Sequence, residues 1–219
     1  MAATVLAAGS WPRSASDPWE TDMRKLIADE WMTLDGVVQA PGYDGEDSDG
    51  GFQHGGWHMP HMDDITTNWV TKTTVETGAF LFGRRTYEIF ASFWPTAPAE
   101  LATLAEVLNN RPKYVASTTL TELLAWQNST VLQGDVAKAV ASLKQEDGGA
   151  LHVVGSSQLT RTLIEHNLVD ELRIFIEPVL VGGGKRIFPE DGTLRRLRLT
   201  GSQVTTTGVI IATYTTAES

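Results

Sequence analysis

The sequence predicts an α/β fold: an open, mainly parallel sheet flanked by helices and closed by a C-terminal antiparallel hairpin. First, short apolar runs alternate with segments of helical apolar spacing from residue 24 onward. Second, runs such as AFLF at 79–82 are apolar throughout, as in parallel strands covered on both faces. Third, strand-forming residues surround Gly201 and Gly208 in the tail at 194–216, which predicts two or three antiparallel strands with turns at these glycines.

The elements of the first half follow from local patterns. RKLIADEW at 24–31 has the composition of a strand, which leads into the turn-forming pair Asp35–Gly36. Gly, Pro and Asp dominate 41–60 and predict a long loop. The apolar residues of 61–78 recur at helical spacing, so we expect a helix there.

In the second half, strands and helices alternate. The strand at 79–82 leads directly into a helix at 85–93. Further strands are expected at 113–117, 129–133, 151–154 and 171–181, and further helices at 134–145 and 156–167. The repeated strand–helix order is what predicts a parallel sheet.

Composition limits the function. The chain has 219 residues, with 17 Lys and Arg against 27 Asp and Glu, so its net charge is −10. This charge argues against nucleic acid or an anionic membrane as partner. No apolar run approaches the ~20 residues of a membrane span, and the absence of cysteine excludes disulfides and thiolate chemistry. We expect a cytoplasmic protein with a small-molecule ligand, in which a flexible or peripheral arm at 1–22 precedes a single domain at 23–219.

Three strand-to-helix junctions are candidates for a ligand site, because ligands of such sheets bind beyond the carboxyl ends of the strands. The segment after the 151–154 strand offers a glycine and a helix start, where free N–H groups attract anions. The segment after 79–82 offers two arginines and a threonine, and the segment after 113–117 offers hydroxyls. Their residues are Gly155, Ser156, Ser157, Gln158 and Leu159, then Gly83, Arg84, Arg85 and Thr86, then Ser117 and Thr118. Each alone also fits an ordinary turn or solvated charges, but together they predict an extended phosphate-bearing ligand such as a dinucleotide.

The order of these motifs resembles a known family. TLDGVVQAPG, FGRRTYE, KYVAS, VVGSSQL and PVLVGGGKRIF are similar to the dihydrofolate-reductase-like superfamily, in the branch of the reductase domain of the bacterial riboflavin-biosynthesis deaminase–reductase. The resemblance covers about 24–215. It implies a dihydrofolate-reductase-like fold, hydride transfer from NADPH to a small planar heterocycle, and a homodimer. It also implies that the three junctions hold the phosphates of NADPH, with an arginine favouring NADP over NAD.

The resemblance leaves the substrate open. Riboflavin-pathway reductases carry an acidic residue where this chain has Val154, so the substrate of that pathway is in question. Asp63 and Asp64 begin the helix that carries the catalytic carboxylate in dihydrofolate reductases, and either is a candidate proton donor or a simple partner of the helix dipole. Asp35 lies in the region that closes on the nicotinamide in this superfamily, or in a plain turn.

The loop before this helix offers further substrate contacts. Phe52 and Trp57 are candidates for stacking on a flat substrate. The histidines of the same loop match no standard zinc spacing, so no metal site is predicted. VGGGKRIF at 181–188 lacks the glycine spacing and the Ser or Thr of a P-loop, so its glycines are interpreted as a backbone bend, with Lys185 a candidate substrate contact. A non-catalytic nucleotide-binding protein and a reductase that uses FMN remain as alternatives.

Overall fold

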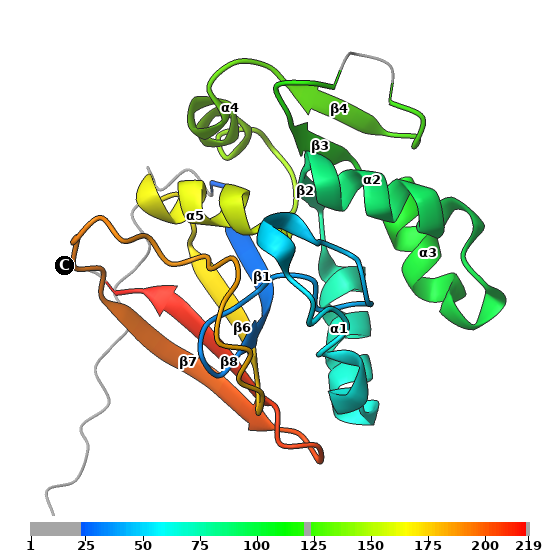
Figure 1. Ribbon diagram of the computed structural model, residues 1–219. Coiled ribbons are helices and arrows are strands. Elements are labelled where there is room, and N and C mark those ends of the chain that lie inside the picture. The colour runs from blue at the N-terminus through cyan, green and yellow to red at the C-terminus, as the bar shows by residue number, and fades with distance from the viewer. Residues whose placement is uncertain (1–22, 121–123, 218–219) are drawn as a thin grey trace, which may run out of the picture.

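One mixed sheet forms the centre of the protein. The computed structural model describes residues 23–120 and 124–217, so the arm predicted at 1–22 lies outside the described residues. The sheet has eight strands in the order β4-β3-β2-β5-β1-β6-β8-β7 (Figure 1). Their bounds are β1 Leu26–Thr33, β2 Ala79–Gly83, β3 Lys113–Ala116, β4 Ser129–Leu132, β5 Leu151–Val154, β6 Glu171–Glu177, β7 Leu197–Val204 and β8 Ile210–Thr216. The pairings from β4 to β6 are parallel, and β8 pairs antiparallel with both β6 and β7, which confirms the predicted fold class.

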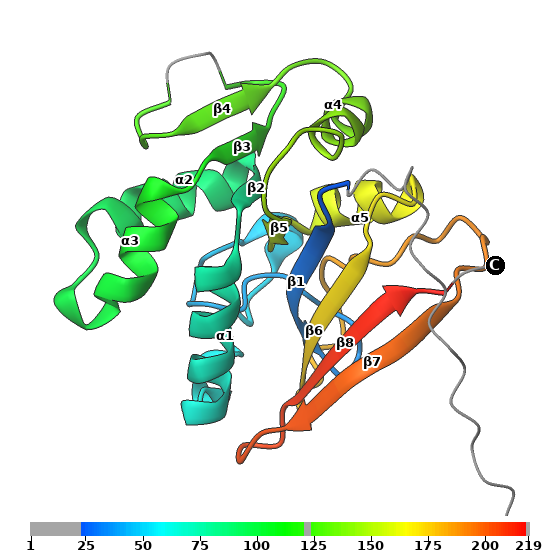
Figure 2. The same cartoon turned by 180° about the vertical axis from the view of Figure 1, so that it is seen from behind.

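Helices cover both faces of the sheet. Their bounds are α1 Asp64–Glu76, α2 Arg84–Phe93, α3 Ala102–Asn110, α4 Val136–Leu143 and α5 Ser157–Glu165. Side chains alternate along β1, so Ala28 and Met32 join the core formed with α4 and α5, whereas Trp31 packs with Trp69 of α1 on the other face. Figure 2 shows the molecule from behind, with α1 and α3 toward the left and the β7–β8 hairpin, which ends the sheet, at the right.

The structure corrects the prediction at three places. Helix α3 was not predicted, although Leu104, Val107 and Leu108 have helical spacing and pack against the β2–β3 region. The strand predicted at 171–181 ends at Glu177, because Pro178 has no N–H to donate to the sheet. Gly201 is not a turn.

Gly201 lies inside β7, where the pairing with β8 shifts at an irregularity between Leu199 and Gly201. A bulge uses the same glycine signal as a turn, so the two are not separable in the sequence. Gly208, in contrast, lies in the β7–β8 turn as predicted, with a positive φ of 89°.

The glycines of VGGGKRIF lie in the long segment between β6 and β7. Gly184 has a φ of 140°, and a Cβ there would lie 2.6 Å from Cγ1 of Val37. A side chain at this position is therefore excluded by both conformation and space. The segment is a backbone bend that lies against the start of the β1–α1 connection, as the sequence indicated.

None of the helices in the described part of the chain is long and apolar enough to cross a membrane.

Candidate functional site

A cavity of about 590 Å³ opens at the carboxyl ends of the central strands. Its walls come from β1, the β1–α1 connection, and the starts of α2 and α5. All of the residues predicted at the three junctions line it: Gly83, Arg84, Arg85, Thr86, Ser117, Thr118, Gly155, Ser156, Ser157, Gln158 and Leu159. The fold thus brings the three junctions to one side of one cavity, as expected for parallel strands that end at a common edge. Val154 and Lys185 also line the cavity.

The junctions after β2 and β5 are bonded to each other. The N–H of Gly83 donates to Oγ of Ser156 at 2.8 Å, and the hydroxyls of Ser156 and Thr86 lie 2.7 Å apart. Gly155 and Ser156 both have a left-handed backbone, with φ of 59° and 67°. For Ser156 this conformation is strained, and the hydrogen bonds of its hydroxyl offset the strain. The two helix starts are therefore held at a fixed separation.

No side chain caps the N-terminus of α2 or that of α5. Helices α1 and α4 differ, because Asp63 accepts from the N–H of Thr66 and Asp135 accepts from two N–H groups of α4. Helix α3, which continues from a short 3-10 helix, also has no side-chain cap but lies away from the cavity. The N-termini of α2 and α5 are both uncapped and border the cavity, so their free N–H groups and positive dipole ends are available to an anionic ligand there.

The cations at the cavity mouth are paired with carboxylates of the protein itself. Arg85 forms ion pairs with Asp47 and Asp49, and Lys185 contacts the same two at 2.6 and 2.8 Å. Hydrogen bonds from Arg85 and then Lys185 lower the pKa of Asp49 to about 2. Arg84 pairs with Glu88 one turn further along α2, at 3.1 Å, with both side chains nearly half exposed. Of these two arginines, only Arg85 forms ion pairs with the β1–α1 connection among the described residues.

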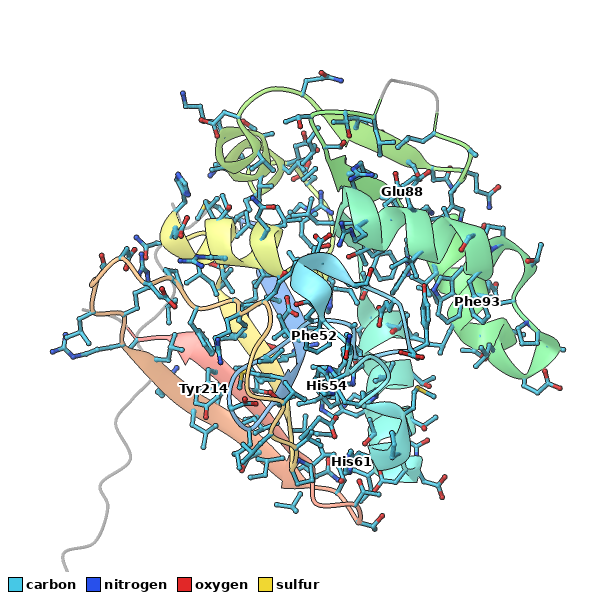
Figure 3. All side chains as sticks on the ribbon, in the orientation of Figure 1. Phe52, His54, His61, Glu88, Phe93 and Tyr214 are labelled. Carbon is cyan, nitrogen blue, oxygen red and sulfur yellow. The ribbon has the colours of Figure 1, made fainter. Side chains whose placement is uncertain are left out.

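The β1–α1 connection lies over the cavity and is held by Gln39. Nε2 of Gln39 donates to the carbonyl oxygens of Asp47 and Asp49, each at 3.0 Å, and Oε1 accepts from the N–H of Lys185. Figure 3 labels Phe52 and His54 on this connection and Glu88 on α2.

Five of the predicted contacts lie outside the cavity, four of them in structural roles and Phe52 in a neighbouring hollow. Asp63 caps α1 and accepts two hydrogen bonds from Thr206, which lower its pKa below its ordinary value. Asp64 is exposed in the first turn of α1. Trp57 is buried and donates from Nε1 to the carbonyl of Gln39, so its indole supports the connection.

Asp35 is the fourth, and it fastens the segment after β6. It accepts from Oγ1 of Thr33 at 2.6 Å and from the N–H of Gly182 at 2.8 Å. The Thr33 hydroxyl is the main cause of its lowered pKa. Phe52 lines a shallower hollow of about 510 Å³ next to the main cavity, together with Lys185. The histidines of the connection do not form a cluster. Among the described residues, no group of three His, Asp or Glu side chains is placed to hold a metal ion.

Sequence analysis missed the acids of β1. Glu30 lines the cavity, although it is only 2% exposed. Burial raises its pKa to about 8, and the Asp29 carboxylate adds to this, against a hydrogen bond from Thr160. Asp29 points to the other face, where it lies 2.8 Å from Nδ1 of His152. The available signal was the pair Asp29–Glu30 inside the strand predicted at 24–31, since ionisable residues are rarely buried in a sheet without a role.

Comparisons with known proteins agree with this architecture. Residues 24–211 match the family model of the RibD C-terminal domain. The chain is 27% identical over 194 residues to the uncharacterized protein YyaP of Bacillus subtilis, which covers 87% of this chain and 94% of that protein. It is 26% identical over 130 residues to the uncharacterized protein YwjB of the same organism, over 59% of this chain and 68% of that protein.

Solved structures show the same fold. A protein from Shewanella sp. PV-4 named for riboflavin biosynthesis superposes with a TM-score of 0.67 at 19% identity, over 89% of this chain and 99% of that one. A pyrimidine reductase-like protein from Corynebacterium diphtheriae gives a TM-score of 0.63 at 12% identity, over 90% and 93%. At these identities the likeness concerns the fold alone.

Proposed function

Since the chain belongs to the RibD C-terminal domain family, we propose that it is an NADPH-dependent reductase. Its substrate is a small planar heterocycle, such as a pterin, a pyrimidine or a related compound with a C=N or C=O bond. The observation that carries the proposal is the pair of uncapped helix N-termini, α2 and α5, that border one cavity. A pyrophosphate placed between them would accept the hydrogen bonds that no side chain of the protein accepts.

The residues at the junctions fit NADPH in charge and chemistry. The backbone at Ser157, Gln158 and Leu159 offers N–H groups to the pyrophosphate, and Thr86 offers a hydroxyl that is already oriented by Ser156. Arg84 and the hydroxyls of Ser117 and Thr118 form the more exposed end of the cavity, which suits the adenosine 2′-phosphate. An arginine at this place favours NADPH over NADH.

When bound, the dihydronicotinamide supplies the hydride. The chain itself orients the two ligands and limits the access of water. The connection held by Gln39, Asp47 and Asp49 covers the cavity and is fixed by Lys185 and Arg85. In this position the connection would limit the access of water to the reacting atoms and so strengthen the polar interactions within the cavity.

Two features bear on the substrate. Val154 lines the cavity where riboflavin-pathway reductases carry an acid, so the phosphoribosylamino pyrimidine of that pathway lacks its partner here. In addition, Lys185 is engaged by Asp47 and Asp49. We therefore propose a substrate without a phosphate group.

The direct test measures cofactor identity and turnover. The purified protein is titrated with NADPH, NADH and FMN by fluorescence, and then mixed with NADPH and 7,8-dihydrofolate, 2-phenyl-1-pyrroline or menadione while absorbance at the NADPH band is followed. We expect NADPH to bind tightest and at least one acceptor to be reduced. A yellow protein that binds FMN in preference would replace NADPH by a flavin. Binding of NADPH with no turnover across the panel would favour a non-catalytic nucleotide-binding protein.

We also propose a homodimer. The edge strand β7 is exposed along its whole length and carries Leu197, Leu199 and Val204 at 45%, 53% and 65% exposure. Such apolar side chains on an open edge are typical of a surface that is covered by a partner. Sedimentation velocity is expected to give twice the monomer mass, and Leu199→Lys is expected to give the monomer. A monomeric wild-type protein at micromolar concentration would refute the dimer.

A further inference from the structure

Glu30 is the one acidic side chain that reaches the cavity from the centre of the sheet. It lies on β1 between β5 and β6, and it is 2% exposed. Its Oε1 lies 2.6 Å from Oγ1 of Thr160 on α5, and no other hydrogen bond reaches its carboxyl group within the described residues. The second oxygen is thus without a protein partner at the cavity wall. A carboxyl group in this position is expected to hold its proton, because ionisation would place an unpaired charge in a poorly solvated site.

The contact with Thr160 is compatible with a protonated carboxyl. Oγ1 of Thr160 also lies 3.3 Å from the carbonyl oxygen of Gly155, the residue that opens the β5–α5 junction. The hydroxyl can therefore donate to Gly155 and accept from Glu30, or donate to Glu30 once that group is ionised. Either protonation state of Glu30 keeps one hydrogen bond. This arrangement suits a group that loses and regains a proton.

The other titratable groups of the cavity are committed elsewhere. Arginine does not give up its proton, and Lys185 is held between two carboxylates. Asp47 and Asp49 are paired with cations. Glu46 also has a pKa raised by burial, but it lies on the β1–α1 connection, and its Oε2 is occupied by the N–H of Gly42 at 2.6 Å.

The charges that face Glu30 from neighbouring elements do not oppose this role. On β1 itself, Asp29 raises the pKa of Glu30. From β5 and β6, His152 and Arg173 approach the Asp29 carboxylate, at 2.8 and 3.8 Å. Across the cavity lie Glu46 and the cluster of Asp47, Asp49, Arg85 and Lys185, whose charges pair with one another. Helix α5 contributes the uncharged Thr160.

We propose that Glu30 is the proton donor of the reduction. The inference rests on the proposed function. Hydride from the dihydronicotinamide forms a C–H bond at the carbon of the substrate C=N or C=O bond, and the π electron pair moves to nitrogen or oxygen. The O–H bond of Glu30 breaks as the proton passes to that atom, which leaves the cofactor oxidised, the substrate reduced by two electrons, and Glu30 as a carboxylate. Water that enters the cavity after product release returns the proton.

The experiment compares wild-type protein with Glu30→Gln, Glu30→Asp and the control Glu165→Gln. Glu165 lies on α5 outside the cavity and pairs with Arg161. The first measurement is the single-turnover rate with NADPH and whichever of 7,8-dihydrofolate and menadione is reduced, between pH 5.5 and 9.5. The wild-type rate is expected to fall above about pH 8. Glu30→Gln is expected to lower the rate by about 10²- to 10⁴-fold, to lose this pH dependence, and to leave the Kd of NADPH within a factor of about three.

Glu30→Asp is expected to keep the pH dependence at a reduced rate, since it retains an acid on a shorter side chain. A structural role alone would instead lower the rate in both variants without changing the shape of the profile. Retention of the wild-type rate by Glu30→Gln, or transfer of the pH dependence to Glu46, would overturn the proposal.

The second measurement is independent of turnover. Glutamate labelled with ¹³C at the side-chain carboxyl is titrated by NMR in the wild-type protein, and the Glu30 signal is assigned by its absence in Glu30→Gln. We expect it to titrate near 8. A Glu30 that is already ionised at pH 6 would overturn the proton donor even if the protein is a reductase. A protein that reduces no acceptor, with Glu30 titrating near 8, would instead overturn the proposed function, and the proton donor with it.

Discussion

Arg84→Ala tests the assignment of NADPH most directly. In the free protein, Arg84 makes only the exposed pair with Glu88, so the substitution should change the free energy of unfolding by less than about 0.5 kcal/mol. If Arg84 binds the 2′-phosphate, a charge-assisted hydrogen bond of roughly 1.5–3 kcal/mol is lost. Release of Glu88 from the arginine costs about 0.5 kcal/mol of this in the wild-type protein. The net loss of about 1–2.5 kcal/mol corresponds to an increase of about 5- to 70-fold in the Kd of NADPH.

The assay is a fluorescence titration of each protein with NADPH and NADH, at 50 and 300 mM salt. NADH lacks the 2′-phosphate, so its Kd should be unchanged. Glu88→Gln frees Arg84 and is expected to tighten NADPH by about two- to threefold at the lower salt concentration.

Arg161→Ala is the matched control. Arg161 forms the same i, i+4 pair on α5, with Glu165 at 3.3 Å and similar exposure, but it lies outside the cavity. It should leave both cofactors unaffected. An equal loss of NADPH and NADH affinity in Arg84→Ala would refute the 2′-phosphate assignment, and a similar loss in Arg161→Ala would indicate a general effect of net charge.

Three further predictions concern the junctions, the cavity mouth and pH. Ser156→Ala removes the acceptor of the Gly83 N–H and should lower the free energy of unfolding, measured in urea, by about 1–3 kcal/mol. Ser156→Gly removes the same acceptor but also relieves the strained left-handed backbone, so its loss should be about 1 kcal/mol smaller. Equal losses in the two variants would contradict the strain at Ser156. Asp47→Asn removes one of the two carboxylates that pair with Lys185 and Arg85 and should therefore tighten NADPH by about two- to threefold at low salt, and an unchanged Kd would show that these pairs do not compete with the cofactor. The raised pKa of Glu30 means that the folded state binds the proton more tightly, so the stability of wild type relative to Glu30→Gln should fall from pH 4.5 to about 8, by up to about 1.4 kcal/mol per pH unit; parallel stability profiles would contradict it.

Sequence periodicity was sufficient for strands such as β2 and β5, because these strands are short and apolar. β2 and β5 were predicted within one residue, and the three junctions followed from the rule that parallel strands end at one edge. Helix α3 was missed although its apolar spacing is regular, since the short 3-10 helices before it give no clear start signal.

Contacts between side chains that lie far apart in the sequence could not be predicted from such patterns. The pairing of Arg85 with Asp47 joins residues 38 positions apart, and it places a carboxylate beside one of the two arginines that were predicted to bind an anion. Asp63 was a candidate acid because it begins a helix, and that position explains its actual contacts, since an N-terminal carboxylate is drawn to free N–H groups. Glu30, the acid that we propose as proton donor, lies on a strand, where its position beside Asp29 was the available signal in the sequence.

The N-caps of α2 and α5 differ from those of α1 and α4 in a way that favours a ligand at the first pair. α1 and α4 carry an aspartate at the N-cap, and each aspartate satisfies N–H groups of its own helix. An aspartate in place of Gly83 or Ser156 would accept hydrogen bonds from the same N–H groups that a phosphate needs. Its negative charge would also repel the phosphate. The hydroxyl of Ser156 instead bonds Gly83 and Thr86, on the neighbouring junction. The free N–H groups are left unsatisfied by the chain itself, so a bound phosphate would complete the caps of α2 and α5 and stabilise the fold as it binds.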